Sequence, residues 1–253
     1  MNKKKSLIDL LIHDLTGPLS IITTSTNNLI KKEDRYGSLT ERQKKTLDII
    51  LRNANKAQTF LHDIIEVYRS EEGILKPDTF YIKDVLRDAI LDAIEIVNPD
   101  FNEELACNNL TDDMKKILTD RGIFIEICGK YEVSPFIHDR KKVQQILRNL
   151  ITNALKYRKK IVNIRISGND DIIIAVEDDG TGIPSERQGD VFKRFLYAKE
   201  LDSGYAGGLG FGLSCVKSIV EALQGSISLM SKEGKGTCFT VTIPPLKSKK
   251  ASE

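Results

Sequence analysis

The sequence predicts a chain in two parts, a hairpin of two long helices followed by an α/β sandwich whose helices cover one face of a largely antiparallel sheet. Three observations predict this architecture. Apolar residues recur at a spacing of three to four over roughly the first 70 positions. The composition then changes at Lys76-Pro77-Asp78, which is typical of a linker, and strand-like segments alternate with helical ones after it. A chain of 253 residues is long enough for two small domains.

The first part is predicted to hold two helices, each roughly 45 Å long at about 1.5 Å per residue. The first helix runs from Ser6 to about Asp34. Tyr36-Gly37-Ser38 interrupts the pattern, and Thr40 caps a second helix that ends near Glu72. A lone hairpin cannot bury both sides of its apolar stripe, whereas two copies packed as a four-helix bundle can. We therefore expect a homodimer built on a dimeric four-helix bundle.

The second part is predicted to mix helices and strands. Helices are expected over 82–97, 141–157 and 213–223, and strands over 124–128, 162–166, 172–176, 226–230 and 238–243. A net charge of +2 gives no support for nucleic-acid binding, and no apolar run approaches the length of a membrane span. The four cysteines lack Cys-x-x-Cys spacing, so we expect reduced, buried thiols.

Asn149 and Asn153 begin the evidence for a nucleotide site. They lie four residues apart and therefore share one face of the predicted helix. An amide oxygen can ligate Mg²⁺ while phosphate oxygens and water complete the octahedron. One turn later, Lys156 can meet a phosphate as a point charge, and Tyr157 can lie against a base.

Asp178 ends a predicted strand and is followed by the turn Gly180-Thr181-Gly182-Ile183. A carboxylate accepts a hydrogen bond from the exocyclic amine of adenine, whereas guanine presents a carbonyl there and is repelled. Gly180 and Gly182 let the backbone approach a base closely, and Ile183 belongs to the same turn. This segment therefore predicts the adenine end of the site.

A second glycine-rich segment opens the last predicted helix. Free N–H groups at a helix start suit an anionic triphosphate. The residues concerned are Gly208, Gly210, Gly212 and Leu213. Before them, Phe192 and Phe195 can anchor a lid over 196–206, and Arg194 can reach the phosphates. The segments match neither a P-loop nor a dinucleotide-binding fingerprint.

His13 is a candidate phosphoryl acceptor on the first helix, inside His13-Asp14-Leu15 with Pro18-Leu19 following. Imidazole is a good nucleophile near neutral pH, because its unperturbed pKa is about 6.5. Asp14 can accept the proton that the other ring nitrogen sheds, or stabilise the imidazolium. Pro18 should bend the helix one turn after His13.

Taken in this order, the motifs resemble those of two-component sensor histidine kinases over nearly the whole chain. The resemblance implies a dimerisation and histidine-phosphotransfer domain at 1–75 and a catalytic ATP-binding domain at 76–246, followed by a disordered tail at 247–253. The second domain would have the fold of kinase, heat-shock-chaperone and mismatch-repair ATPases. The implied activity is ATP-dependent autophosphorylation of His13 and transfer to an aspartate of a response-regulator receiver domain.

The resemblance also assigns residue roles. It makes Asn153 the main magnesium ligand with Asn149 assisting, gives the adenine contact to Asp178, and places Thr237 near that carboxylate. Related ATPases carry a glutamate where this chain has Asn149, so we expect slow hydrolysis. A slow ATPase and a non-catalytic phosphotransfer scaffold are the alternative functions.

The chain departs from the family pattern at two places. Gly17 stands where the family commonly has Thr or Asn, so weak phosphatase activity toward the partner is expected. Residues 98–119 look like an insertion of roughly 15 residues. Since no sensor domain precedes His13, we expect input from a separate or truncated sensor domain. The expected location is the cytoplasm, as a whole protein or as part of a membrane-bound sensor.

Overall fold

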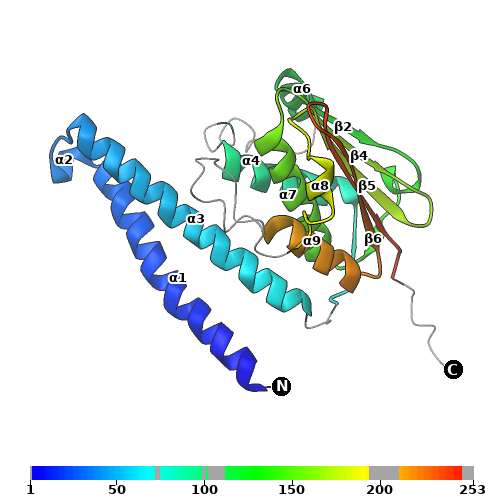
Figure 1. The fold of residues 1–253 in the computed structure, drawn as a ribbon, viewed down its shortest axis with the longest axis horizontal. Coiled ribbons are helices and arrows are strands. Elements are labelled where there is room, and N and C mark those ends of the chain that lie inside the picture. Colours follow the sequence, from blue (N-terminus) through cyan, green and yellow to red (C-terminus); the bar gives the residue numbers. More distant parts are fainter. Residues whose placement is uncertain (1, 72–74, 99–100, 102–111, 194–210, 247–253) are drawn as a thin grey trace. The chain divides into compact units, whose positions relative to one another are not determined.

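The computed structural model describes residues 2–71, 75–98, 101, 112–193 and 211–246, and it divides into two compact units (Figure 1). One unit holds residues 1–69 and the other holds most of the chain from Ser70 onward. Within the described ranges, no helix is both long enough and apolar enough to cross a bilayer.

The first unit is a helical hairpin. It comprises α1 (Asn2–Lys31), the short α2 (Glu33–Tyr36) and α3 (Glu41–Glu71). The predicted start of the second helix is confirmed, because Thr40 and Gln43 form a reciprocal cap. The Thr40 N–H donates to Gln43 Oε1 at 2.8 Å, and the Gln43 N–H donates to Thr40 Oγ1 at 3.3 Å. Gln58 Nε2 on α3 donates to Ser20 Oγ on α1 at 3.4 Å, which ties the two long helices together.

The hairpin exposes much of its apolar stripe. On the predicted stripe, Ile22 of α1 is 42% exposed and Ile50 of α3 is 41% exposed, whereas Ala54 is only 6% exposed. Their neighbours Ile21 and Ile49 are 68% and 59% exposed. Large aliphatic side chains at such exposure leave apolar area in water that a packing partner would remove. A single chain therefore does not cover the face that its sequence periodicity predicts to be buried.

The second unit is built on a five-stranded sheet of order β2-β4-β5-β7-β6. Its strands are β2 (Ile123–Ile127), β4 (Val162–Ser167), β5 (Ile172–Asp178), β6 (Ser226–Lys232) and β7 (Gly236–Ile243). The β2–β4 pair is parallel and the other pairs are antiparallel, so the sheet is mixed but largely antiparallel. All five predicted strands are present.

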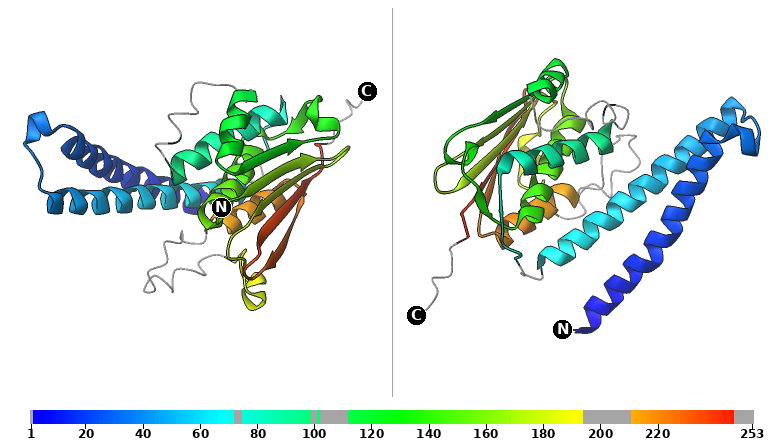
Figure 2. Two further views of the ribbon diagram at one scale, coloured as in Figure 1. Left: turned by 90° about the horizontal axis from the view of Figure 1, so that it is seen from above. Right: turned by 180° about the vertical axis from the view of Figure 1, so that it is seen from behind.

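Helices cover one face of this sheet (Figures 1 and 2). They are α4 (Ile82–Val97), α7 (Arg140–Tyr157) and α9 (Phe211–Ala222). Along β5, alternate residues are buried, which is the period-2 pattern of a strand with one covered face. Val85, Leu86 and Ile90 on α4 are fully buried, and α4 packs along α7. The helices and their placement on one face agree with the sequence prediction.

A second, two-stranded sheet was not predicted. It pairs β1 (Asp78–Phe80) with β3 (Phe136–His138), and a 3₁₀ turn, η1 (Lys130–Glu132), precedes β3. Interpreting Asp78 as part of a linker was therefore wrong, because Asp78 opposes His138 in this sheet. Three-residue strands are too short to show an alternating pattern, so no periodic signal indicated them.

The structure also shows a helix at the end of the predicted insertion and the burial of three cysteines. α6 (Asp112–Asp120) contains the predicted helical segment Lys115–Leu118, and residues 102–111 lie outside the described residues. Cys215 is buried, as expected, but Cys128 and Cys238 are only half-buried. Cys238 is half-buried because it lies at an alternate position of β7 that points away from the helices, and periodicity does not say which face of a sheet is covered.

His138 gives the second unit a pH-dependent stability. Its ring is 1% exposed, its Nδ1 accepts the Asp139 N–H at 2.9 Å, and it stacks on Phe136. Burial lowers the pKa of His138, and the neighbouring Asp139 opposes this in part. Because the unfolded chain binds the proton more readily, stability should fall as the pH drops below about 6.5, by at most about 1.4 kcal/mol per pH unit.

Urea unfolding near pH 7.5 and near pH 5.5 checks this expectation. His138→Asn keeps an acceptor oxygen close to the position of Nδ1 but does not titrate in this range. We expect the variant to lose less stability between the two pH values than the wild type does. Equal losses would assign the pH dependence to other groups.

Candidate nucleotide site

α7 begins at a side-chain cap and carries both predicted asparagines. Asp139 Oδ1 accepts the Lys142 N–H at 3.1 Å, which satisfies one of the free amides at the helix start. Asn149 is buried at 8% exposure, and Asn153, one turn further on, is half-buried. Gln145 Nε2 donates to Cys215 Sγ at 3.4 Å, which joins α7 to α9.

Asn149 has an unusual hydrogen-bonding state. In the described part of the chain, Nδ2 of Asn149 and Oγ1 of Thr152 are buried without a hydrogen-bond partner. An unpaired buried polar group costs free energy, so such a group in a native protein calls for an explanation, and a ligand can provide one. The two ends of an amide are interchangeable by a simple rotation, so the unpaired atom can equally be the oxygen. The asparagine pair therefore fits a ligand that offers an acceptor to the amide nitrogen, or a donor or a cation to the amide oxygen.

Asp178 is the last residue of β5 and is buried at 7% exposure. Its Oδ1 accepts the Gly180 N–H at 2.8 Å. Burial raises the pKa of Asp178, and hydrogen bonds from the backbone of Gly180 and Thr237 oppose the rise. A partly desolvated carboxylate with few partners accepts a further donor strongly.

Hydroxyl groups from the neighbouring strands complete this end of the site. Thr237 lies directly opposite Asp178 in the β5–β7 ladder and is also buried. Its Oγ1 is 2.9 Å from Ser231 Oγ on β6, and Ser231 Oγ accepts the Ile183 N–H at 2.8 Å. Ser231 therefore fixes the glycine turn after β5 to β6. No sequence pattern indicated Ser231, because it lies 48 positions from its partner Ile183.

Close approaches at glycines show that the predicted segments meet. A Cβ at Gly180 would lie 2.2 Å from the Tyr157 carbonyl oxygen, so the end of α7 touches the turn after Asp178. A Cβ at Gly182 would lie 2.1 Å from the Lys232 carbonyl oxygen, and a Cβ at Gly212 would lie 3.9 Å from Asn153 Nδ2. Only glycine permits the first two contacts. The asparagine helix, the Asp178 turn and the start of α9 thus form one site.

Asp179 has a structural task that its sequence position did not indicate. Its carboxylate accepts the backbone N–H groups of Lys159, Lys160 and Ile161 at 2.9 to 3.1 Å. These bonds lower the pKa of Asp179, although the residue is only half-buried. The segment after α7 is thereby pinned to the end of β5, which keeps Tyr157 beside Gly180. Adjacent carboxylates 178 and 179 therefore have different surroundings and different tasks.

The remaining predicted residues fall into three groups. Lys156 is exposed and Tyr157 is 51% exposed at the end of α7, Leu213 is half-buried on α9, and Phe192 packs edge-on against Phe239 with ring centroids 6.1 Å apart. Arg194, Phe195, Gly208 and Gly210 lie outside the described residues, as does the predicted lid. His13 and Asp14 lie on α1, in the other unit.

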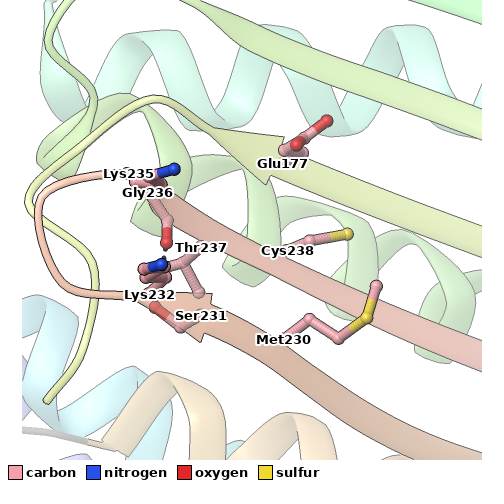
Figure 3. A pocket seen from close by; sticks show the side chains of 8 residues that line it. All are labelled: Glu177, Met230, Ser231, Lys232, Lys235, Gly236, Thr237 and Cys238. Atoms are coloured by element: carbon pink, nitrogen blue, oxygen red, sulfur yellow. Dashed lines mark hydrogen bonds between the residues drawn. The ribbon is translucent and has the colours of Figure 1, made fainter.

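A shallow hollow of about 290 Å³ lies against the same strands (Figure 3). Its lining residues are Glu177, Met230, Ser231, Lys232, Lys235, Gly236, Thr237 and Cys238. Glu177, Cys238 and Met230 lie in one cross-strand row, next to the row that holds Asp178 and Thr237. The hollow contains no residue of α7 but shares Ser231 and Thr237 with the candidate nucleotide site, so it adjoins that site. In the described ranges, no group of three or more His, Cys, Asp and Glu is placed to hold a metal.

Comparison with known proteins identifies the α/β unit. Residues 138–247 match the family described as histidine kinase-, DNA gyrase B-, and HSP90-like ATPase. The fold is also that of the full-length ShkA–AMPPNP complex, with a TM-score of 0.66 at 20% identity over 95% of this chain and 46% of that one. The matched family is described as ATPases, and the arrangement of residues around Asp178 is compatible with ATP binding.

Curated relatives extend the similarity to most of the chain. The histidine protein kinase SaeS of Staphylococcus aureus is 29% identical over 96% of this chain and 64% of its own length. The autoinducer 2 sensor kinase/phosphatase LuxQ of Vibrio vulnificus is 29% identical over 79% of this chain and 22% of its own. The chain thus spans less than two thirds of the length of these relatives. The resemblance drawn from the motifs is confirmed: residues 138–247 match this ATPase family, and most of the chain is similar to curated sensor histidine kinases.

Proposed function

We propose that this chain is an ATP-dependent protein histidine kinase, which phosphorylates His13 and passes the phosphoryl group to an aspartate of a response-regulator receiver domain. The observation that carries the proposal is the meeting of the asparagine face of α7, the buried carboxylate of Asp178 and the start of α9. These features suit a purine nucleotide with an anionic tail. We assign residues 76–246 to this catalytic domain and residues 1–75 to dimerisation and phosphotransfer.

At the adenine end, Asp178 would accept a hydrogen bond from the exocyclic amine. Its burial makes this bond strong, because little water competes for the carboxylate. Thr237 and Ser231 hold the strands in register beside it, and Gly180 and Gly182 allow the backbone to lie close to the base. We further propose that Tyr157 lies against the base, and that Ile183 contributes apolar contact.

At the phosphate end, Asn149 and Asn153 would hold Mg²⁺, with Asn153 as the main ligand. The half-buried position of Asn153 beside Gly212, and the unpaired amide of Asn149, support this assignment. The ion would neutralise phosphate charge and orient the γ-phosphate. Lys156 supplies a further positive charge from the same helix. Gly208, Gly210, Gly212 and Leu213 would offer backbone N–H groups to the phosphates. Phe192 and Phe195 would anchor the lid, and Arg194 would reach the phosphates.

On α1, His13 would act as the nucleophile and Asp14 as its proton acceptor. A ring nitrogen of His13 bonds to the γ-phosphorus while the bond to the leaving ADP oxygen breaks. Asp14 then holds or takes the proton of the other ring nitrogen. Asn149, being an amide, cannot activate water as a general base, which favours transfer to histidine over hydrolysis.

We propose that two chains associate through the hairpin. The support is the exposure of Ile21, Ile49 and their neighbours, which a second hairpin would cover. The receiver domain would dock on the same bundle near His13, and the input signal would come from a sensor domain, separate or on the same protein.

Autophosphorylation with γ-labelled ATP tests the proposal, scored for label that is acid-labile and base-stable. We expect label on the wild type, none on His13→Gln, and a loss of at least about 100-fold in rate for Asn153→Ala, because a metal ligand is removed. His62→Gln serves as the control, since it removes a histidine from α3 instead. Label that persists in His13→Gln would contradict the assignment of the acceptor. Steady phosphate release without label would favour the slow ATPase.

A further inference from the structure

Three chain segments meet at residues 136–139, just before the nucleotide helix. The segment after α3 enters as β1 and pairs with β3, with Asp78 opposite His138 and Phe80 opposite Phe136. The segment after β7 arrives from the other end of the chain, where the Leu246 N–H donates to the Ile137 carbonyl at 3.3 Å. α7 leaves the same place at Arg140.

Asp139 makes the link between the first and the last of these segments. Its Oδ2 accepts the Lys76 N–H at 2.9 Å, and its Oδ1 accepts the Lys142 N–H at 3.1 Å. The carboxylate is 5% exposed, so both bonds are shielded from water. One side chain therefore binds the linker with one oxygen and caps the nucleotide helix with the other.

A helix cap needs only one acceptor oxygen, and Ser or Thr fills that task as well as Asp does. The second oxygen of Asp139 is used on Lys76, five positions after α3 ends at Glu71. Asn149 follows Asp139 by ten positions on one continuous helix, a distance of roughly 15 Å. If the helix moves as a rigid body, a displacement of its first turn at Asp139 also displaces Asn149.

We propose that Asp139 is a positioning residue that holds the linker after α3 against the nucleotide helix, a link called the latch below. The affinity of the site for ATP then depends on whether the hydrogen bond from the Lys76 N–H to Asp139 is formed. The inference rests on the proposed function only for the location of the nucleotide. Coupling of this kind is reciprocal, so nucleotide binding must also strengthen the latch. α4 holds the same end of α7 through Arg140 Nη2 and Asp88 Oδ2 at 2.6 Å, which limits the size of the effect.

Variants can separate the latch from the cap. Asp139→Ser keeps a capping oxygen but loses the acceptor for the linker, whereas Asp139→Ala loses both. Lys76→Pro removes only the N–H donor on the linker side, and Lys76→Ala is its control, because it keeps the N–H and changes only an exposed side chain. We expect Asp139→Ser and Lys76→Pro each to weaken AMPPNP binding about threefold to tenfold. The double variant should be no weaker than either single variant, because both remove the same bond.

Hydrogen exchange of the Lys76 amide in the full chain supplies a readout that a purely structural cap would not move. Saturating AMPPNP should slow this exchange in the wild type and leave it unchanged in Asp139→Ser. Asp88→Asn is the matched control: it weakens an attachment of α7 that does not involve the linker, so the response at Lys76 should persist. Thermal melting of every variant establishes that it is folded.

The possible outcomes distinguish failure of the latch from failure of the proposed nucleotide site. A wild type that binds AMPPNP normally, with Lys76 exchange indifferent to the nucleotide and with unchanged affinity in Asp139→Ser and Lys76→Pro, would overturn the latch alone. A folded wild type that binds no AMPPNP would overturn the proposed nucleotide site and the latch with it. Weaker binding in both variants, together with nucleotide-dependent protection of Lys76, is the expected result.

Discussion

Replacing Asp178 by asparagine should weaken ATP binding by at least about 100-fold. The substitution removes the negative charge of the acceptor, so the charge-assisted hydrogen bond is lost. It also introduces an NH₂ group that can face the adenine amine, which places one donor against another. The expected loss is about 3 kcal/mol, which corresponds to about two powers of ten in Kd. Calorimetric titration of the purified chain with AMPPNP measures it.

Glu177→Gln is the matched control for this substitution. It makes the same change from carboxylate to amide one position earlier on β5, where the side chain points into the exposed hollow on the other face of the sheet. We expect its affinity for AMPPNP to match that of the wild type. The preference for ATP over GTP should also fall in Asp178→Asn only. Unchanged nucleotide affinity in a folded Asp178→Asn protein would remove Asp178 from the site.

Gly236→Ala should lower the free energy of unfolding by about 3 to 5 kcal/mol. Gly236 has φ +103°, and a Cβ there would lie 1.9 Å from the Asp178 carbonyl oxygen. The backbone of β5 or β7 must therefore move, at the point where the register sets Thr237 opposite Asp178. We expect urea unfolding to detect the loss of stability, and nucleotide titration to detect weaker binding by the fraction that stays folded.

Two other glycines separate the causes of this effect. Gly234 has φ +77° with nothing within 4 Å of an added Cβ, so Gly234→Ala carries only the backbone strain, about 1 kcal/mol. Gly189 has neither a positive φ nor a close neighbour, and Gly189→Ala should be nearly neutral. The difference between Gly236→Ala and Gly234→Ala is then the cost of the steric contact. Equal stabilities of these two variants would show that β5 and β7 accommodate the added methyl group without a loss of folding free energy.

Long periodic segments made most of the fold predictable. α4 was expected over Ile82–Val97 and has those bounds, and the reciprocal cap at Thr40 follows from neighbours three residues apart. Hydrogen bonds of this kind lie within one or two turns, so sequence patterns reveal them. The five strands of the large sheet were likewise predictable, because each contains apolar residues in alternation or in a short run.

The features that escaped prediction depend on partners far away in the chain. Asp179 binds three amides that lie 18 to 20 positions earlier, and Ser231 binds Ile183 across 48 positions. β1 and β3 are each three residues long and depend on their mutual pairing. Of the candidate site, the sequence indicated the residues with ligand chemistry, namely Asn149, Asn153 and Asp178. It did not indicate the residues that hold these segments together, because their role is decided by the tertiary structure.

The order of strands in the large sheet has a consequence for how such chains can diversify. β5 and β7 are neighbours with a continuous register from Ile172↔Ile243 to Asp178↔Thr237, although the chain makes a long excursion through α9 and β6 between them. The entropic cost of closing a loop grows only slowly with its length. The excursion can therefore gain or lose residues while the two strands, and the buried carboxylate between them, stay in place. Related chains can therefore change in the segment between β5 and β7 without losing the register that sets Thr237 opposite Asp178.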